Sequence, residues 1–341
     1  MKTSLLAVAL AGAFASNANA QSNVTIYGAL DAGLIKRTGT STTVGKRDAN
    51  TLGFRGVEDL GSGVKALFHL EIRYEPDTGT LESGVRPLFQ GQSRVGLQGG
   101  FGTLRIGRGT TSYMESVTAF EPFHGTPSPA GFYTDVAVAG YTVQPLDAPG
   151  NSFNRISNAM WYNTPEFGGF QLNATVATRE ANGGAQVIGR GTALLPQYRA
   201  NSEASANPFS ISATYKSGSV GAMLAVERNG VESELWSVAA SVKPSKALKL
   251  MAIYGHQDRG HTMALNESTK AWVVGANYTV ATGTLLVGYG HKEPEGVTRT
   301  RQLSIGYEYP LSKRTYLYAD ASRKENATTV NHVDLGIRAS F

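Results

Sequence analysis

The sequence predicts an all-β fold, a transmembrane antiparallel β-barrel of about sixteen strands. Three observations support this prediction. Apolar and polar residues alternate in runs of about ten, and Gly, Asn, Asp and Ser interrupt the runs about every dozen residues. Beyond the N-terminal segment, no apolar run approaches the about twenty residues that a helical span needs. A single stretch, Thr110 to Asn154, breaks the alternation over about forty-five residues, far more than a usual connection.

Residues 1–20 have the features of a cleaved signal peptide. Lys2 provides a positive start, Leu5 to Phe14 an apolar core, and Ala18-Asn19-Ala20 a cleavage site with small residues. The apolar core is too short to span a membrane as a helix. We therefore expect the mature chain to be exported, and residues 21–341 to form a single barrel domain.

The expected strands each have one apolar face and one small or polar face. In the first strand Val24 and Ile26 share one face, whereas Thr25 and Asp31 share the other. The expected strands are 24–34, 51–57, 64–75, 92–98, 103–108, 155–163, 170–176, 209–215, 220–226, 236–242, 248–254, 272–280, 284–292, 303–307, 314–323 and 333–341. In this assignment short turns alternate strictly with longer, more polar loops, as in outer-membrane barrels.

The composition and the strand pattern exclude several other classes. The chain has no Cys, so disulfides, thiolate metal sites and Cys nucleophiles are excluded, and no other metal site or cofactor is expected. Its net charge of +5 is small and scattered, which argues against nucleic-acid binding. A soluble β-sandwich would carry large apolar side chains, but many apolar positions here are Gly, Ala or Val. Aromatic residues near strand ends, such as Trp236 and Trp272, instead fit interfacial girdles.

The stretch from Thr110 to Asn154 is rich in Gly, Pro and aromatic residues. Its aromatic content argues against disorder, because such a segment can bury enough surface to fold against another element. A barrel of about sixteen strands is wide enough to leave an aqueous channel. We predict that this stretch folds into the lumen and sets the size and charge of a pore.

Six segments, found in order between residue 22 and the end of the chain, resemble those of a known family. They are Ser22–Gly28, Leu52–Gly61, Gly102–Arg108, Tyr162–Phe170, Leu311–Thr315 and Gly336–Phe341. Together they resemble the general porins of Gram-negative bacteria, of the trimeric sixteen-stranded type found in betaproteobacteria. The resemblance implies a homotrimer in contact with outer-membrane lipid and lipopolysaccharide, and a channel for ions and small hydrophilic solutes. It also implies a third external loop that folds inward, here residues 110–154, and a terminal Phe341 that is recognised by the barrel-insertion machinery.

The alternation of strand residues assigns the side chains that face the lumen. Because Leu52 and Phe54 are expected to face lipid, Thr51 and Arg55 face inward. The same reasoning turns Glu71, Arg73, Arg94, Arg105 and Arg155 inward, the last because Ile156 is expected to face outward. An Arg that faced lipid at mid-membrane would cost about 2–4 kcal/mol, which supports these assignments.

The family's constriction sets a row of wall Arg residues against acids on the inward loop. By resemblance Arg155 and Arg94 match two of these Arg positions, and Glu71 matches a wall carboxylate. Thr51 occupies a third Arg position, where the sequence departs from the family pattern. We expect Arg55, two residues further along the same face, to substitute for the missing Arg.

The inward loop offers three acids to oppose this wall, Glu115, Glu121 and Asp135, of which Glu121 is the first choice. Wall Arg residues outnumber the wall and loop acids, so we predict a weakly anion-selective pore.

Two alternatives concern function rather than fold. An outer-membrane lipase or protease would need a catalytic motif, and neither a Gly-x-Ser-x-Gly elbow nor a His-Glu-x-x-His pattern occurs. We therefore expect no enzymatic activity. A substrate-specific channel would carry an aromatic track through the constriction. The loop does contain Phe120, Phe123, Phe132, Tyr133 and Tyr141, so the sequence leaves this alternative open.

Overall fold

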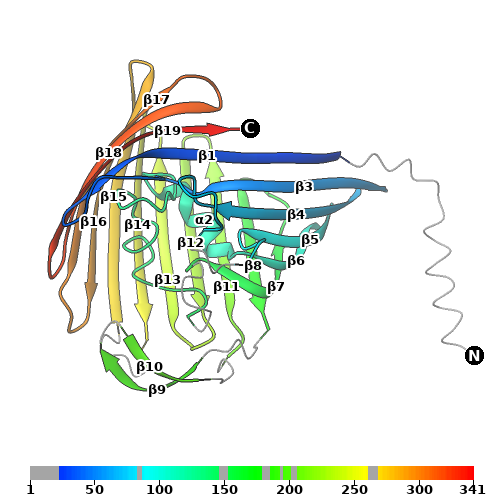
Figure 1. The fold of residues 1–341 in the computed structure, drawn as a ribbon. Helices are drawn as coiled ribbons and strands as arrows, with labels where there is room; N and C mark the ends of the chain where they lie inside the picture. The colour runs from blue at the N-terminus through cyan, green and yellow to red at the C-terminus, as the bar shows by residue number, and fades with distance from the viewer. Residues whose placement is uncertain are drawn as a thin grey trace, which may run out of the picture.

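A computed structural model describes residues 23–82, 87–145, 153–178, 185–192, 195–200, 206–259 and 268–341. The expected signal peptide, residues 1–20, lies outside the described residues. The model confirms the predicted fold class, a closed antiparallel barrel of sixteen strands (Figure 1). The strands of the ring are β1 (Asn23–Arg37), β3 (Asn50–Gly61), β4 (Val64–Tyr74), β5 (Gln92–Gly99), β6 (Gly102–Thr110), β7 (Arg155–Asn163), β8 (Phe170–Ala177), β11 (Phe209–Ser217), β12 (Val220–Arg228), β13 (Glu234–Val242), β14 (Leu248–Asp258), β15 (Ser268–Val280), β16 (Gly283–Pro294), β17 (Thr300–Pro310), β18 (Thr315–Glu325) and β19 (Thr329–Ser340).

The barrel closes where the first strand meets the last. The first half of β1 pairs with β3, from Asn23 opposite Val57 to Ala29 opposite Thr51. The second half pairs with β19, and two backbone hydrogen bonds between Gly28 and Phe341 extend this seam. Closure satisfies the backbone polar groups that an open sheet edge would leave exposed to lipid.

The start of β1 and the end of β19 both lie at the end of the barrel that carries the short turns. At the opposite end β2 (Thr43–Gly45) pairs with β1, and β9 (Ala185–Thr192) pairs with β10 (Leu195–Ala200) outside the ring. The strict alternation of short turns and longer loops is wrong at two places. Only residues 326–328 join β18 to β19, and residues 229–233, which join β12 to β13, are no longer than the next short turn, 243–247. Within the described ranges, no helix is long and apolar enough to cross a bilayer.

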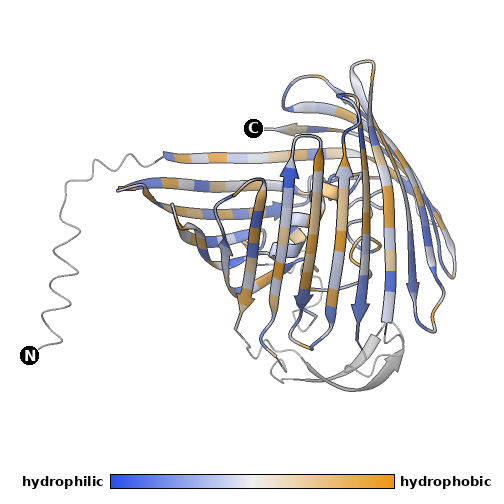
Figure 2. Ribbon diagram, turned by 180° about the vertical axis from the view of Figure 1, so that it is seen from behind, coloured by the Kyte–Doolittle hydropathy of each residue, from blue (hydrophilic) through white to orange (hydrophobic). Residues whose placement is uncertain are grey.

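The outer face of the barrel is apolar. Hydropathy alternates from residue to residue along the strands, as Figure 2 shows. Exposed apolar side chains include Val24, Ile26, Leu30, Val95, Ile106, Leu172, Leu224, Val274, Leu303, Ile305, Val333 and Leu335. This face is suited to contact lipid acyl chains.

The hydrophobic core lies inside the barrel, between one side of the wall and the connection from β6 to β7. We call this connection, residues 111–154, the inner loop. Figure 1 shows its helix α2 (Ser112–Val117) within the ring of strands. The inner loop contributes buried residues that include Tyr113, Met114, Val117, Phe120, Phe123, Phe132, Tyr133, Val136, Tyr141 and Val143. The wall contributes Ile156, Ala159, Trp161, Ala177, Met223, Ala225, Leu235, Ala239, Ile253, Ala271, Val273 and Leu286. Each large side chain buried in this way stabilises the docked loop by about 1.5–3 kcal/mol.

Glycines on the lumen face of the wall make room for the inner loop. A Cβ atom at Gly275 would lie 2.6 Å from the Pro122 ring, and one at Gly290 would lie 2.8 Å from the Phe132 ring. A Cβ atom at Gly288 would also meet the Phe132 ring. These glycines are required by close approach, because both their backbone and the loop above them are fixed by packing.

We predict that Gly288→Val weakens docking of the inner loop by about 1–3 kcal/mol, since the added methyl groups overlap the Phe132 ring. Single-channel recording should show a noisier current, and the inner loop should become accessible to protease. Gly100→Val is the matched control, because a Cβ atom there meets no atom within 4 Å. Equal noise in both variants would contradict the packing role of Gly288.

Candidate pore constriction

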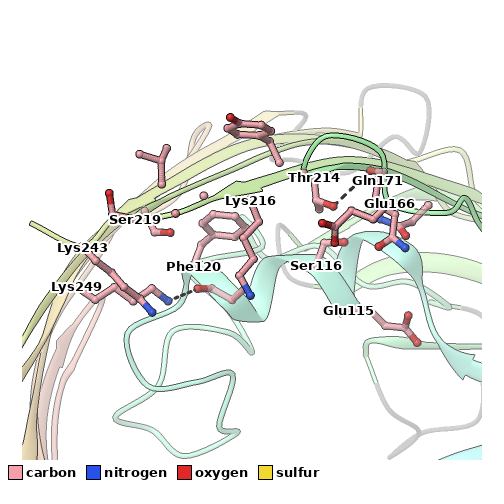
Figure 3. Close-up of a pocket in the computed structure, with 18 of the residues that line it drawn as sticks. Glu115, Ser116, Phe120, Glu166, Gln171, Thr214, Lys216, Ser219, Lys243 and Lys249 are labelled. Atoms are coloured by element: carbon pink, nitrogen blue, oxygen red, sulfur yellow. Dashed lines mark hydrogen bonds between the residues drawn. The ribbon is translucent and has the colours of Figure 1, made fainter. Parts of the chain in front are cut away.

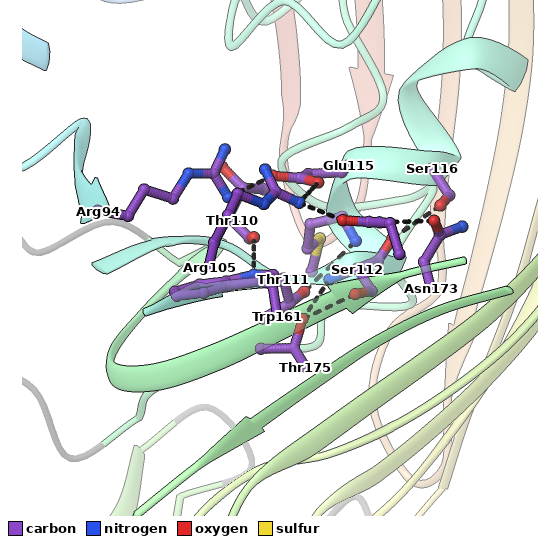
Figure 4. Close-up of polar contacts among 12 residues, drawn as sticks. Arg94, Arg105, Thr110, Thr111, Ser112, Glu115, Ser116, Trp161, Asn173 and Thr175 are labelled. Carbon is purple, nitrogen blue, oxygen red and sulfur yellow. Dashed lines mark hydrogen bonds and ion pairs between the residues drawn. The ribbon is translucent and has the colours of Figure 1, made fainter. Parts of the chain in front are cut away.

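The inner loop begins with a short helix that is fixed to the wall by polar contacts. The Thr111 hydroxyl caps α2 by accepting a hydrogen bond from Met114 N at 3.4 Å, and it donates to Glu227 Oε2 at 2.7 Å. The η1 turn (Thr118–Phe120) follows, and Lys249 Nζ on β14 donates to the Ala119 carbonyl at 2.6 Å (Figure 3). Ser112 N donates to Thr175 Oγ1 at 3.0 Å (Figure 4). Tyr113 N also donates to Ser210 Oγ on β11 at 2.9 Å, so the start of the inner loop is held by four strands, β8, β11, β12 and β14.

The later part of the inner loop is held by β15 to β18, the strands that follow β14 around the ring. Asn277 Nδ2 donates to the Pro122 carbonyl at 2.8 Å, and Gln302 Nε2 donates to the Gly131 carbonyl at 2.9 Å. The carboxylate of Asp135 forms ion pairs with Lys292 on β16 and with Lys324 on β18, the latter at 2.5 Å. Burial alone would raise the pKa of Asp135, but these two ammonium groups hold it below its usual range. Asp135 thus ties the loop to the wall.

The side of the lumen that the inner loop does not cover is lined by β3 to β7 and by Lys46, which precedes β3, and it is rich in cations. We call Lys46, Arg55, Arg73, Arg94, Arg105 and Arg155 the basic arc. Figure 4 shows the guanidinium groups of Arg94 and Arg105 directed toward Glu115 of α2, at 2.9 and 3.5 Å. Arg94 also lies over the Trp161 ring, 5.4 Å from its centroid. Glu115 is therefore the inner-loop acid that faces the arginines of the wall.

Arg155 reaches the wall carboxylate Glu71, with 3.9 Å between Nη2 and Oε1. Its side chain is only 5% exposed, and its Nε donates to the Gly91 carbonyl at 2.7 Å. The expectation that Ile156 faces lipid is wrong, because Ile156 is 3% exposed and packs in the core. The pairing of β6 with β7 shifts register between Gly107 and Gly109, and Asn158 has a positive φ of 52°. The alternation of faces is interrupted there.

Arg55 and Thr51 both have the lumen-facing parity that the sequence predicts. Arg55 is paired in register with His69, which is paired with Arg94, so these three side chains form a row across β3, β4 and β5. Together with Arg105 they line a cavity of about 310 Å³. Arg55 lies over the Tyr27 ring at 5.3 Å, whereas Thr51 is the register partner of Arg73. Arg55 therefore places a cation nearer the short-turn end than Thr51.

Glu121 lies inside the inner loop rather than at the lumen. It is 1% exposed, and its two oxygens accept hydrogen bonds from Gly125 N at 2.7 Å and Phe132 N at 3.0 Å. Burial raises the pKa of Glu121 from 4.5 to about 7, although the backbone donors partly offset this effect. Glu121, the acid expected first at the constriction, thus holds the backbone of the inner loop together instead.

Two cations near the lumen were not anticipated from the sequence, because residues 35–50 offered no strand parity to place them. Lys46 lies 2.7 Å from Glu82 and 3.0 Å from Glu75. The fully buried Arg47 joins Glu308 at 2.6 Å and Asp320 at 2.7 Å, which fixes the first outer loop to β17 and β18. The only sequence signal is the charged run Lys46-Arg47-Asp48 directly before a strand.

Comparison with known proteins identifies the family. A family model described as Gram-negative porin matches residues 7–329. The chain belongs to the Gram-negative porin family. Outer membrane porin protein 32 of Delftia acidovorans is 30% identical over 99% of this chain and 94% of its own length. An outer membrane porin protein of Bordetella pertussis is 25% identical over 100% of both chains.

Solved structures agree with the fold of this porin. An anion-selective porin from Comamonas acidovorans superposes with a TM-score of 0.76 at 21% identity, over 94% of this chain and 100% of that one. The outer membrane protein OmpT of Vibrio cholerae gives a TM-score of 0.66 at 13% identity. The porin is located in the outer membrane and forms a diffusion channel, and its family and fold are those of channels.

We predict that Asp135→Asn weakens docking of the inner loop by about 1–3 kcal/mol, because Lys292 and Lys324 lose their shared carboxylate. The stabilisation depends on ionised Asp135, so in the unmodified porin it is present at neutral pH and is lost as the pH falls through the lowered pKa. Single-channel recording should show loop noise at neutral pH in the variant, and in the unmodified porin only in strong acid. Asp77→Asn, at an exposed position in an outer loop, is the control. If Asp135→Asn gave no more noise than this control, Asp135 would not be holding the inner loop on the wall.

We predict that Glu121 makes the folded porin less stable as the pH rises from about 4.5 to 7. The folded state holds the Glu121 proton more tightly than the unfolded state, so this contribution is complete below 4.5 and is lost through about 7. The slope is at most about 1.4 kcal/mol per pH unit for one proton. Urea midpoints in detergent at several pH values should show this slope reduced in Glu121→Gln. An identical slope in the variant would assign it to other groups.

Proposed function

We propose that this porin is a general diffusion pore for small hydrophilic solutes with a weak preference for anions. Its basic arc forms the conducting wall, and Glu115 is the loop acid across from it. The observation that carries the proposal is the sharing of carboxylates within the arc. Glu71 lies between Arg73 and Arg155, Glu82 between Lys46 and Arg73, and Glu115 between Arg94 and Arg105.

The basic arc keeps a positive excess after this pairing. Its six cations are Lys46, Arg55, Arg73, Arg94, Arg105 and Arg155, and the four carboxylates paired with them are Glu71, Glu75, Glu82 and Glu115. Arg55 has no carboxylate partner among the described residues. In a narrow bore a fixed positive excess raises the local concentration of anions.

The aromatic residues of the inner loop favour a general pore over a substrate-specific one. Phe120, Phe123, Phe132, Tyr133 and Tyr141 are all at most 5% exposed and pack in the core. An aromatic track for sugars would present its rings to the solute. These rings instead anchor the loop, so we propose that selection depends on size and charge.

Assembly as a homotrimer is also part of the proposal. One of the similar solved structures is the trimer form of OmpT from Vibrio cholerae. The apolar outer face of the barrel offers area for subunit contact as well as for lipid and lipopolysaccharide. We also propose that Phe341, which is 56% exposed at the closing seam, acts as the signal for the barrel-insertion machinery.

We predict that the purified porin in a planar bilayer under a KCl gradient gives a reversal potential of the sign for anion preference. Arg55→Glu should shift the ratio of anion to cation permeability toward cations by about twofold or more, since it removes the unpaired cation and adds an acid. Lys313→Glu makes the same charge change in an exposed short turn and should shift the ratio less. Cation preference in the unmodified porin would overturn the charge assignment, and absence of conductance would overturn the pore itself.

A further inference from the structure

A second cluster of cations lies on the short-turn side of the inner loop. Lys216 ends the inward face of β11, Lys243 follows β13, and Lys249 is near the start of β14. All three line one cavity of about 480 Å³ beneath α2 and η1 (Figure 3). None of them belongs to the basic arc.

The backbone brings these lysines together. Val242 and Leu250 are register partners across β13 and β14, so Lys243 and Lys249 lie opposite each other at the next position. Lys216 is paired with Gly221, and Gly221 with Ser241. Gly221 has no side chain, and the Phe120 ring packs over it, 3.5 Å from where its Cβ atom would lie.

Among the residues that the structure describes, two of the three ammonium groups have no partner. Lys249 donates to the Ala119 carbonyl at 2.6 Å, which fixes its position beside η1. Within the described residues, the side chains of Lys216 and Lys243 form no hydrogen bond and no ion pair. Glu115 also lines the cavity but is held by Arg94 and Arg105. Figure 3 shows Glu166, the other acid there, on the far side of the cavity from Lys243 and Lys249.

Neutral hydrogen-bonding groups complete the lining. Besides the charged residues, the cavity is bordered by Ser112, Ser116, Asn163, Gln171, Asn173, Thr214, Ser219 and Ser241. The Ser116 and Thr214 hydroxyls donate to the carbonyls of Ser112 and Gln171, whereas the Ser219 and Ser241 hydroxyls can donate to an oxyanion. Ammonium groups bind such anions as point charges. The combination of unpaired ammonium groups and neutral donors suits a small, doubly charged oxyanion.

We propose that Lys216, Lys243 and Lys249 form an exit site for small doubly charged oxyanions on the short-turn side of the constriction. In outer-membrane barrels the short turns face the periplasm. Glu115 contacts the arginines of the basic arc and also lines this cavity, so an anion that leaves the arc enters the exit site. The proposal rests on the proposed function, since it assumes that anions pass along the arc.

The test uses inorganic phosphate at pH 8 as the probe, with chloride as the current carrier in planar bilayers. Because the chain has no Cys, an Asp77→Cys background and an impermeant thiol reagent identify which end of the porin faces each chamber. Millimolar phosphate on the short-turn side should reduce the chloride current, and the block should depend only weakly on voltage. Phosphate on the long-loop side should give a weaker block with a steeper voltage dependence.

The paired variant Lys216→Gln with Lys243→Gln should raise the half-blocking phosphate concentration by about fivefold or more. The matched control, Lys246→Gln with Lys313→Gln, removes two cations from short turns outside the cavity and should change it by less than about twofold. Lys249 is kept, because it holds the inner loop at Ala119. Equal weakening in both paired variants would mean that net charge, rather than a site, controls the block.

Recordings from the same channels distinguish a failure of the exit-site proposal from a failure of the proposed anion preference. Anion preference without phosphate block, or with a block unchanged in the Lys216/Lys243 variant, would overturn the exit site and leave the proposed function intact. Cation preference with a block that the variant abolishes would overturn the selectivity and retain the site.

Discussion

The arrangement of this porin depends on one constraint, the apolar patch on the lumen face of its wall. Along β12 to β16 the inward side chains include Met223, Leu235, Ile253 and Leu286, so the middle of this part of the wall is apolar on both faces. A patch of this kind cannot be left in a water-filled bore, because each exposed side chain would cost about 1.5–3 kcal/mol. The inner loop covers it with its own aromatic residues. The pore is consequently displaced toward β3 to β7, where the inward side chains are charged.

Because the inner loop is docked against one side of the wall, most of its acids hold the loop in place, whereas the wall cations line the pore. Asp135 is used to tie the loop to Lys292 and Lys324, and Glu121 organises the backbone of the loop itself. Glu115 alone among the three predicted acids meets the arginines. The charge of the conducting path is therefore set mainly by the rigid strands. A charge on a hydrogen-bonded ladder keeps its position, whereas a charge on a loop moves with the loop.

The sequence predicted most of the fold because the period of a strand is strict. Once Leu52 and Phe54 were assigned to lipid, the alternation predicted that Arg55 faces the lumen, and in the structure Arg55 lies in one row with His69 and Arg94. The same rule failed at Ile156, where a register shift adds a residue that no alternation reveals. The alternation rule could not place Arg47, because this residue precedes its strand. It could not place the inner loop either, because the residues of the loop follow no period. The burial of Glu121 depends on Gly125 and Phe132 donating to it, and such contacts follow only from tertiary structure.

The glycines of the lumen face are visible in the sequence, but their contacts with the inner loop are seen only in the structure. In the sequence, Gly275, Gly288 and Gly290 only weaken the strand pattern, since glycine adds no apolar side chain to either face. In the structure they are the positions where Pro122 and Phe132 touch the wall. A glycine on the inward face of a barrel strand, opposite a loop rich in aromatic residues, is therefore a readable signal of loop docking. The half of the lumen face that lacks such glycines opposite aromatics is then the half where the charges line the pore.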